Sequence, residues 1–140
     1  MQVTVAIELY DQLTQHAQAC LPREACGLLG ATGELEAGVR IARFVPTRNI
    51  AREVDRFAID PLAIARTSTE LRAVGLRLWG TFHSHPGSPA RPSMSDHAGC
   101  GAGLIHLILS LKGQQPGDLL TAWRHFDGKL SQLPLRICTD

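Results

Sequence analysis

Two histidines and an aspartate follow one another in an order that suits a metal ion. His83 and His85 are separated by one serine at the end of an apolar run, and Asp96 comes eleven residues after His85. Side chains on a strand alternate between its two faces, so we expect both imidazoles to project on one side. Two imidazoles and one carboxylate suit zinc and leave its fourth tetrahedral position open for water. The spacing therefore predicts a metal centre that performs hydrolysis.

Each of these motifs also has an ordinary explanation. Histidines in a His-x-His pair on a strand often have no metal and are simply polar or partly buried residues. The spacing Ser93-x-x-Asp96 is that of a capping box, in which the serine accepts a backbone N–H and the aspartate lies near the positive end of a helix. A lone glutamate such as Glu24 is usually a solvated charge. The metal hypothesis therefore depends on these residues occurring together, and Asp96 can serve as both cap and ligand.

The wider pattern resembles the JAMM (MPN+) family of metallopeptidases. It is carried by the segment Pro22-Arg-Glu-Ala-Cys-Gly-Leu-Leu-Gly30, by the His-Ser-His-Pro run that begins at His83, and by the Ser-x-x-Asp motif that ends at Asp96. The order of the expected elements is similar over nearly the whole chain. The resemblance implies a single α/β domain with a mixed, mainly antiparallel sheet and flanking helices, related to the cytidine-deaminase fold.

The resemblance also implies a role for each residue of the site. One zinc ion per chain would be held by His83, His85 and Asp96. Glu24 would act as the general base on the bound water, and Ser93 would stabilise the tetrahedral intermediate. These roles agree with general chemistry, because zinc lowers the pKa of its water, a carboxylate can accept the proton, and a hydroxyl can donate to an oxyanion.

The substrate that the resemblance implies is the C-terminal Gly-Gly tail of a ubiquitin-like, β-grasp sulfur-carrier protein, in a peptide or an isopeptide bond. We expect an extended tail to add along an exposed edge of the strand that bears His83 and His85, with glycine favoured where the backbone approaches the ion. Only seven residues separate Asp96 from Leu104, so the long insertion with which eukaryotic relatives hold a second ubiquitin does not fit.

Three other functions share this fold: a non-catalytic interaction scaffold, a RadC-like hydrolase, and a phage-tail hydrolase that works beside a cysteine peptidase domain. The complete set of proposed site residues argues against the scaffold. We expect neither hydrolase, because the given sequence starts directly with the catalytic fold, unlike RadC proteins, and a companion domain does not fit within its 140 residues. The oligomeric state stays open.

Composition supports one globular domain over residues 1–140. Hydrophobic residues make up 44% of the chain, and 14 Lys and Arg stand against 13 Asp and Glu. This balance lacks the basic excess of nucleic-acid-binding proteins. No apolar run reaches membrane-spanning length, and the N-terminus lacks the pattern of a signal peptide. The four cysteines form no C-x-x-C pair, which favours reduced thiols and a cytoplasmic protein.

Hydrophobic periodicity places the elements along the chain. We expect a first strand with Val3 and Val5, a helix that ends before Pro22, strands at 25–30 and 35–45 joined by a turn at 32–33, a short strand at 57–59, a helix at 61–74, a strand at 76–85, a loop at 86–92, a short helix at 96–100, a strand at 104–111, and a hairpin of 119–126 and 129–137 around a turn at 127–128.

Four further residues lie near the motifs. Cys26, beside Glu24, is interpreted as a small core residue, and Cys100 as a packing residue. His97 points away from its neighbour Asp96 on a helix and is expected at the surface. Arg91 either meets a carboxylate of the substrate or is solvated.

Overall fold

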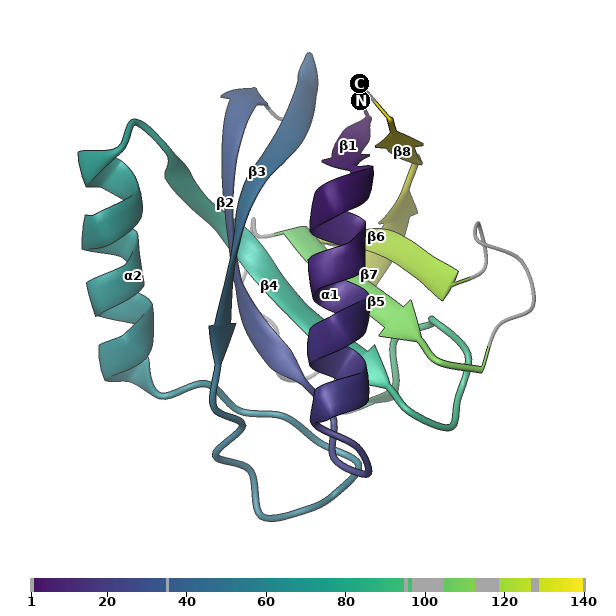
Figure 1. Ribbon diagram of the computed structural model, residues 1–140. Coiled ribbons are helices and arrows are strands. Elements are labelled where there is room, and N and C mark those ends of the chain that lie inside the picture. Colours follow the sequence, from purple (N-terminus) through teal and green to yellow (C-terminus); the bar gives the residue numbers. More distant parts are fainter. Residues whose placement is uncertain are drawn as a thin grey trace.

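The computed structural model describes residues 2–34, 36–94, 96, 105–112, 119–126 and 129–139. Within them an eight-stranded sheet is flanked by two helices (Figure 1). The elements are β1 (Val3–Ala6), α1 (Ile7–Ala19), β2 (Cys26–Glu34), β3 (Gly38–Thr47), α2 (Pro61–Ala73), β4 (Arg77–His85), β5 (Ile105–Ser110), β6 (Leu120–Phe126), β7 (Lys129–Leu133) and β8 (Leu135–Cys138). The strands lie in the order β7-β6-β5-β4-β2-β3-β1-β8.

The sheet is mixed, and most of its pairings are antiparallel. Antiparallel pairings join β2 to β3 and β4, and they join β6 to β5 and β7. Parallel pairings join β4 to β5 and place β1 between β3 and β8. The predicted fold class, a single α/β domain with a mixed and mainly antiparallel sheet, is therefore confirmed.

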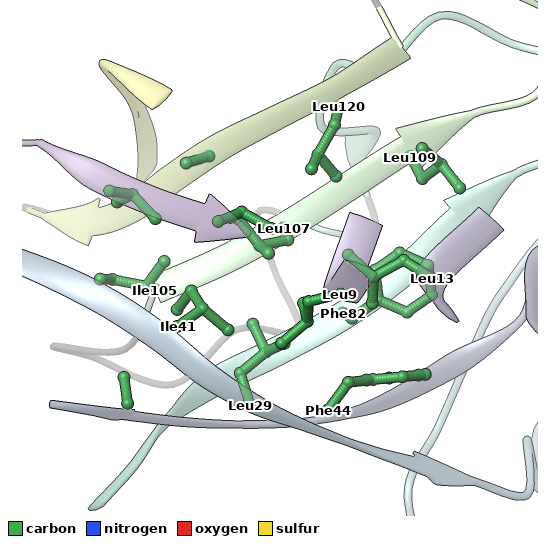
Figure 2. Packing of buried hydrophobic residues seen from close by; sticks show 14 of the residues in the cluster. Leu9, Leu13, Leu29, Ile41, Phe44, Phe82, Ile105, Leu107, Leu109 and Leu120 are labelled. Atoms are coloured by element: carbon green, nitrogen blue, oxygen red, sulfur yellow. The ribbon is translucent and has the colours of Figure 1, made fainter. Parts of the chain in front are cut away.

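Helix α1 closes the main hydrophobic core on one face of the sheet. Leu9, Leu13 and Ala17 recur every four residues, so they form one stripe, and all three are buried. This stripe packs among apolar side chains of the central strands, including Phe82 on β4 and Leu107 on β5 (Figure 2). The face of β4 and β5 that bears these two residues is therefore completely apolar at its centre.

Helix α2 lies on the opposite face of the sheet. Asp60 caps its start by accepting from the Leu62 amide at 3.0 Å, and Gly75 with φ +80° follows its end. A Cβ atom at Gly30 would meet the Leu71 side chain of α2 at 2.6 Å. Because the neighbouring residues of β2 point into the α1 core, Gly30 faces the other side. The helix at 61–74 was thus predicted almost to the residue.

The predicted turn at residues 32–33 is wrong. Both residues belong to β2, where Thr32 pairs with Arg40 and Gly33 pairs with Val39. The strand continues because Gly33 adopts φ +100°, which a residue with a Cβ would rarely accept. The chain reverses instead between Glu34 and Gly38, which face each other at the end of the ladder.

The predicted strand at residues 57–59 is also absent. These residues lie in the loop that joins β3 to α2, and they form no sheet ladder. The Asn49 side chain binds backbone groups of this loop, accepting from the Ala58 amide at 3.1 Å and donating to the Arg56 carbonyl at 2.9 Å. Side-chain hydrogen bonds thus take the place of a neighbouring strand.

The predicted single strand at 129–137 is divided at Pro134. β7 ends at Leu133, and β8 begins at Leu135 on the opposite edge of the sheet beside β1. Proline cannot donate to a ladder, which stops β7, while its carbonyl accepts from the Val3 amide at 2.9 Å and starts the new pairing. The expected turn at 127–128 and most of the expected helix at 96–100 lie outside the described residues.

Two wider expectations can be compared with the described part of the chain. No helix there is long and apolar enough to cross a membrane. The cysteines described, Cys20, Cys26 and Cys138, are all free thiols. Cys100 lies outside the described residues.

Candidate metal centre

The last residues of β4 carry the two histidines of the motif. His83 pairs with Cys26 of β2 and Ile108 of β5, and its ring Nε2 lies 3.2 Å from Nε2 of His85. The two imidazoles therefore share one face, as strand alternation requires. The same pairings limit one expectation. β4 has a partner on each side from Gly80 to His83, so an exposed edge for a substrate tail can lie only beyond His83.

Asp96 brings a carboxylate to these imidazoles. Its Oδ2 lies 3.1 Å from His83 Nε2 and 3.3 Å from His85 Nε2. The three atoms form a nearly equilateral triangle with sides of 3.1 to 3.3 Å. Ligand atoms about 2.0 to 2.1 Å from a tetrahedral zinc ion lie about 3.3 to 3.4 Å apart, so the triangle fits such an ion.

Asp96 also forms the capping box with Ser93. The Ser93 amide donates to Asp96 Oδ2 at 2.8 Å, and Ser93 Oγ accepts from the Asp96 amide at 3.1 Å. The cap and the imidazole contacts thus use the same carboxylate oxygen. The capping box fixes the direction of the aspartate toward the histidines.

Each imidazole is held in place by a neighbouring residue. The Nδ1 of His85 donates to the Pro89 carbonyl at 2.7 Å, which leaves the Nε2 lone pair free for a metal. The ring of His83 stacks on Phe57 with centroids 4.4 Å apart and an interplanar angle of 16°. His83 is only 1% exposed, and this burial lowers its pKa and favours the neutral ring that binds metals.

The pKa values of His85 and Asp96 follow from their contacts. Burial alone would lower the pKa of His85, but its hydrogen bonds to Asp96 and Pro89 and the charge of Asp96 raise it. Burial would likewise raise the pKa of Asp96, yet the hydrogen bonds from His83 and His85 hold it far below its usual range. These hydrogen bonds therefore favour the ionised form of Asp96.

Glu24 lies at the edge of this cluster, just before β2. One carboxylate oxygen of Glu24 and the ligand atoms of His83 and His85 all lie within 4.8 Å of one another. The residue is 6% exposed, and among the described residues its Oε1 has no hydrogen-bond partner. Burial raises the pKa of Glu24 to about 7, with opposing contributions from the charges of His85 and Asp96. A buried carboxyl with this pKa can exchange a proton near neutrality.

The remaining candidates contribute no atom to the triangle of proposed ligand atoms, although Ser93 binds Asp96. Ser93 is exposed at the start of the capped turn, and Arg91 is exposed in the loop before it. Cys26 is fully buried, and burial raises the pKa of its thiol, which agrees with its interpretation as a core residue. His97 lies outside the described residues.

Three residues at the site were not found from the sequence. Phe57 stacks on His83, Asn49 donates to the Glu24 carbonyl at 2.9 Å, and Ser84 Oγ accepts from the Ala25 amide at 2.8 Å. The central serine of the His-Ser-His motif is a visible signal for Ser84. Nothing in the periodicity singles out Asn49 or Phe57, because their roles arise from an irregular loop.

Comparison with curated proteins gives two relatives. The tail tip assembly protein K of Escherichia phage N15 is 32% identical over 118 residues, which cover 79% of this chain and 41% of that protein. A probable TtuB-protein conjugate cleaving protease of Thermus thermophilus is 32% identical over 89 residues, which cover 63% of this chain and 56% of that protein. The chain thus spans about half the length of these relatives.

Solved structures show the same fold over nearly the whole chain. A protein of Desulfitobacterium hafniense with a known solution structure matches with a TM-score of 0.86 and 27% identity, covering 99% of this chain and 94% of that one. The crystal structure of a JAB1/MPN domain protein from Archaeoglobus fulgidus matches with a TM-score of 0.60 and 17% identity, covering 96% and 97% of the two chains.

The model of a protein family described as prokaryotic homologs of the JAB domain matches residues 6–126. That segment includes the proposed base, both histidines and the capped aspartate. The resemblance to JAMM and MPN proteins is therefore confirmed, and the chain belongs to the prokaryotic JAB-domain family.

Proposed function

We propose that this protein is a zinc metallopeptidase with one metal ion per chain. The observation that carries the proposal is the triangle of ligand atoms from His83, His85 and Asp96, with sides of 3.1 to 3.3 Å. When bound, zinc would lower the pKa of a water molecule and polarise the carbonyl to be cleaved. The family relationship and the similarity to a protein named as a protease support this function.

The other two residues would handle the proton and the developing charge. Glu24 accepts a proton from the attacking water and later returns it to the leaving amine, for which a pKa of about 7 is well suited. Ser93 donates its hydroxyl to the oxyanion of the tetrahedral intermediate. The Ser93 hydroxyl lies close to the proposed metal ligand, because its Oγ accepts from the Asp96 amide at 3.1 Å.

We propose a ubiquitin-like sulfur-carrier protein with a C-terminal Gly-Gly as the substrate. The similarity to a TtuB-conjugate cleaving protease supports this class. Glycine suits the site because a backbone without Cβ atoms can approach a metal between buried side chains. Since β4 is paired on both sides, the tail would bind beyond its carboxyl end, where the loop 86–92 leaves His85.

The phage relative supports a second candidate function. A tail tip assembly protein shares 32% identity with this chain over 118 residues. The alternative is therefore a phage-tail hydrolase that cleaves a peptide without a folded carrier. The two functions share the proposed metal centre and differ in what binds around it.

Metal analysis tests the first part of the proposal. We expect one zinc ion per chain in the wild type, and sharply less in the variants His83→Ala, His85→Ala and Asp96→Asn. Leu62→Ala, an exposed change on α2, is the control and should retain the metal. Full zinc occupancy in all three site variants would refute the assignment.

Three substrates test the second part: a carrier fusion ending in Gly-Gly-X, its Ala-Ala counterpart, and the free tail peptide. We expect the zinc-loaded enzyme to cleave the first much faster than the others, because the folded body orients the tail. Equal rates on all three would favour the phage-tail type of activity.

We also propose that the functional domain takes in residues 1–140. β8 lies beyond the segment matched by the family model, yet it pairs with β1 from Val3 to Ala6 and extends the same sheet. A chain that ends at residue 134 should therefore unfold at a lower temperature than the full chain. An unchanged melting temperature would place the boundary before β8.

A further inference from the structure

Glu24 stands outside the hydrogen-bond ladder of the sheet. The pairing of β2 with β4 begins only at Cys26, opposite His83. In the described part of the chain the Glu24 Oε1 has no hydrogen-bond partner that would fix the side chain. The backbone from which the side chain extends therefore has a direct influence on the position of this oxygen.

Two side chains hold the peptide group that joins Glu24 to Ala25. Asn49 Nδ2 donates to the carbonyl of this group at 2.9 Å, and Ser84 Oγ accepts from its N–H at 2.8 Å. The Ser84 amide also donates to the Ala25 carbonyl at 3.0 Å. The peptide plane next to the carboxylate is thus bound on both sides, once from the strand of the histidines and once from a distant loop.

Asn49 connects this peptide to Phe57, the residue whose ring stacks on His83. Its Nδ2 also donates to the Arg56 carbonyl at 2.9 Å, and its Oδ1 accepts from the Ala58 amide at 3.1 Å. These two groups flank Phe57, whose ring stacks on His83. A fourth hydrogen bond, from the Ala51 amide to Oδ1 at 3.0 Å, completes the set.

The orientation of the Asn49 amide follows from these contacts. Both partners of Nδ2 are carbonyl oxygens, and both partners of Oδ1 are amide groups. If the amide were flipped, the Asn49 oxygen would face two carbonyl oxygens and the Asn49 nitrogen would face two backbone N–H groups, so all four contacts would be unfavourable. The Asn49 side chain can therefore form its four hydrogen bonds only when the loop that carries Phe57 and the Glu24 backbone lie in their present positions.

We propose that Asn49, the sole asparagine of the chain, is a positioning residue that sets Glu24 relative to the two histidines by holding the Glu24–Ala25 peptide. This inference rests on the proposed function, in which Glu24 is the general base. Its alternative is that Asn49 only stabilises the loop between β3 and α2. The two differ in whether the loss of Asn49 slows catalysis in protein that is folded and loaded with metal.

The test compares Asn49→Ala and Asn49→Asp with the wild type. Aspartate keeps the acceptors but replaces both donors with an oxygen that repels the Glu24 and Arg56 carbonyls, so both variants release the peptide. We expect one zinc ion per chain in each variant, KM within about threefold of the wild-type value, and kcat lowered about 10- to 100-fold, as for a displaced catalytic group.

Asp60→Ala is the matched control for loop stability. It removes one side-chain hydrogen bond at the end of the same loop, the cap to Leu62, and leaves the four hydrogen bonds of Asn49 in place. We expect Asp60→Ala to lower the melting temperature without lowering kcat. If the Asn49 variants behave in the same way as this control, the positioning role is refuted.

Phe57→Leu separates the two connections of Asn49. It removes the ring stack on His83 and leaves the hydrogen bond to the Glu24 carbonyl in place. We expect a smaller loss of kcat than in Asn49→Ala. An equal loss of kcat in the two variants would assign the effect to the stacking of Phe57 on His83. It would overturn the proposal for Glu24.

Hydrogen exchange gives a readout that needs no activity. In metal-loaded Asn49→Ala the Ala51 and Ala58 amides lose their acceptor, and the Ala25 amide belongs to a peptide that only Ser84 would still hold. All three amides should exchange faster than in the wild type, while the Leu29 amide within β2 stays protected. Unchanged exchange at Ala25 would show that Asn49 does not hold the peptide. An inactive wild type would refute the proposed function, whereas an active wild type, an inactive Glu24→Gln and a fully active Asn49→Ala would refute this inference alone.

Discussion

Successive residues of β4 lie in two different environments. Phe82 faces the α1 core, where its ring meets Phe44 edge to face with centroids 5.2 Å apart. His83 faces the other side, where it stacks on Phe57 and lies 3.1 Å from the Asp96 carboxylate. Both side chains are almost fully buried. Burial on the α1 face therefore stabilises the fold, while burial on the opposite face shifts the pKa values of polar groups.

The two faces differ in how their buried groups are satisfied. The core around α1 needs only close packing, because its side chains are apolar. The opposite face buries Glu24, His83 and His85, whose desolvation is offset only in part by hydrogen bonds within the described residues. Such a cluster costs stability in the metal-free protein and is typical of a functional site.

The largest expected effect lies on the polar face. Glu24→Gln should lower kcat about 10²- to 10⁴-fold, because an amide cannot accept the proton of the attacking water. Zinc content and the far-ultraviolet circular dichroism spectrum should stay as in the wild type. Hydrolysis at more than a tenth of the wild-type rate would exclude Glu24 as the base.

The matching change on the apolar face is Phe82→Ala. Removing this ring should lower the free energy of unfolding by about 3 to 5 kcal/mol, measured by urea denaturation, because a cavity remains beside Phe44. The folded fraction should still bind zinc. A loss of less than 1 kcal/mol would show that α1 can close over the cavity. The apolar face would then contribute less to stability than the comparison of the two faces requires.

Ser93→Ala tests a residue of the capping box to which the proposed mechanism gives a second role. Loss of the cap should cost about 1 kcal/mol of stability. Loss of an oxyanion donor should also lower kcat about 10²-fold with little change in KM and in bound zinc. Reduced stability with normal kcat would leave Ser93 with its capping role alone.

The smallest expected effect concerns the metal-free protein and its pH dependence. Burial raises the pKa of Glu24 from 4.5 to about 7, so the ionised form is disfavoured in the folded state. This penalty is absent below the unfolded pKa, grows as pH rises from 4.5, and is complete above about 7. Metal-free Glu24→Gln should therefore melt above the wild type at pH 8 and close to it at pH 4.5. Melting curves with a constant difference across this range would contradict the prediction.

Regular segments near the site were predicted well because local patterns specify them. Alternation placed both histidines of β4 on one face, and Asp60-Pro61 with Gly75 marked the ends of α2. The capping box between Ser93 and Asp96 is likewise a contact over three residues. In each case the residues that decide the geometry are neighbours in the sequence.

The errors occur where distant segments compete with local signals. Thr32-Gly33 has the composition of a turn, but the ladder with β3 extends through it to Glu34. Phe57 has the composition of a strand, but Asn49 holds its backbone in a loop. Pro134 was a visible interruption, yet only the edge of β1, which the folded sheet brings next to the end of β7, explains why the chain changes its pairing partner there.

The sequence by itself determined the family, the fold class and the chemical types of the proposed site, because motif spacing and hydrophobic periodicity are local properties. Only the tertiary structure decided that a Glu24 carboxylate oxygen lies within 4.8 Å of the ligand atom of His83. It also decided how Asn49 and Ser84 bind the Glu24–Ala25 peptide. The reason is physical: side-chain hydrogen bonds between an irregular loop and a strand end have no periodicity, and they exist only after the sheet has brought these segments together.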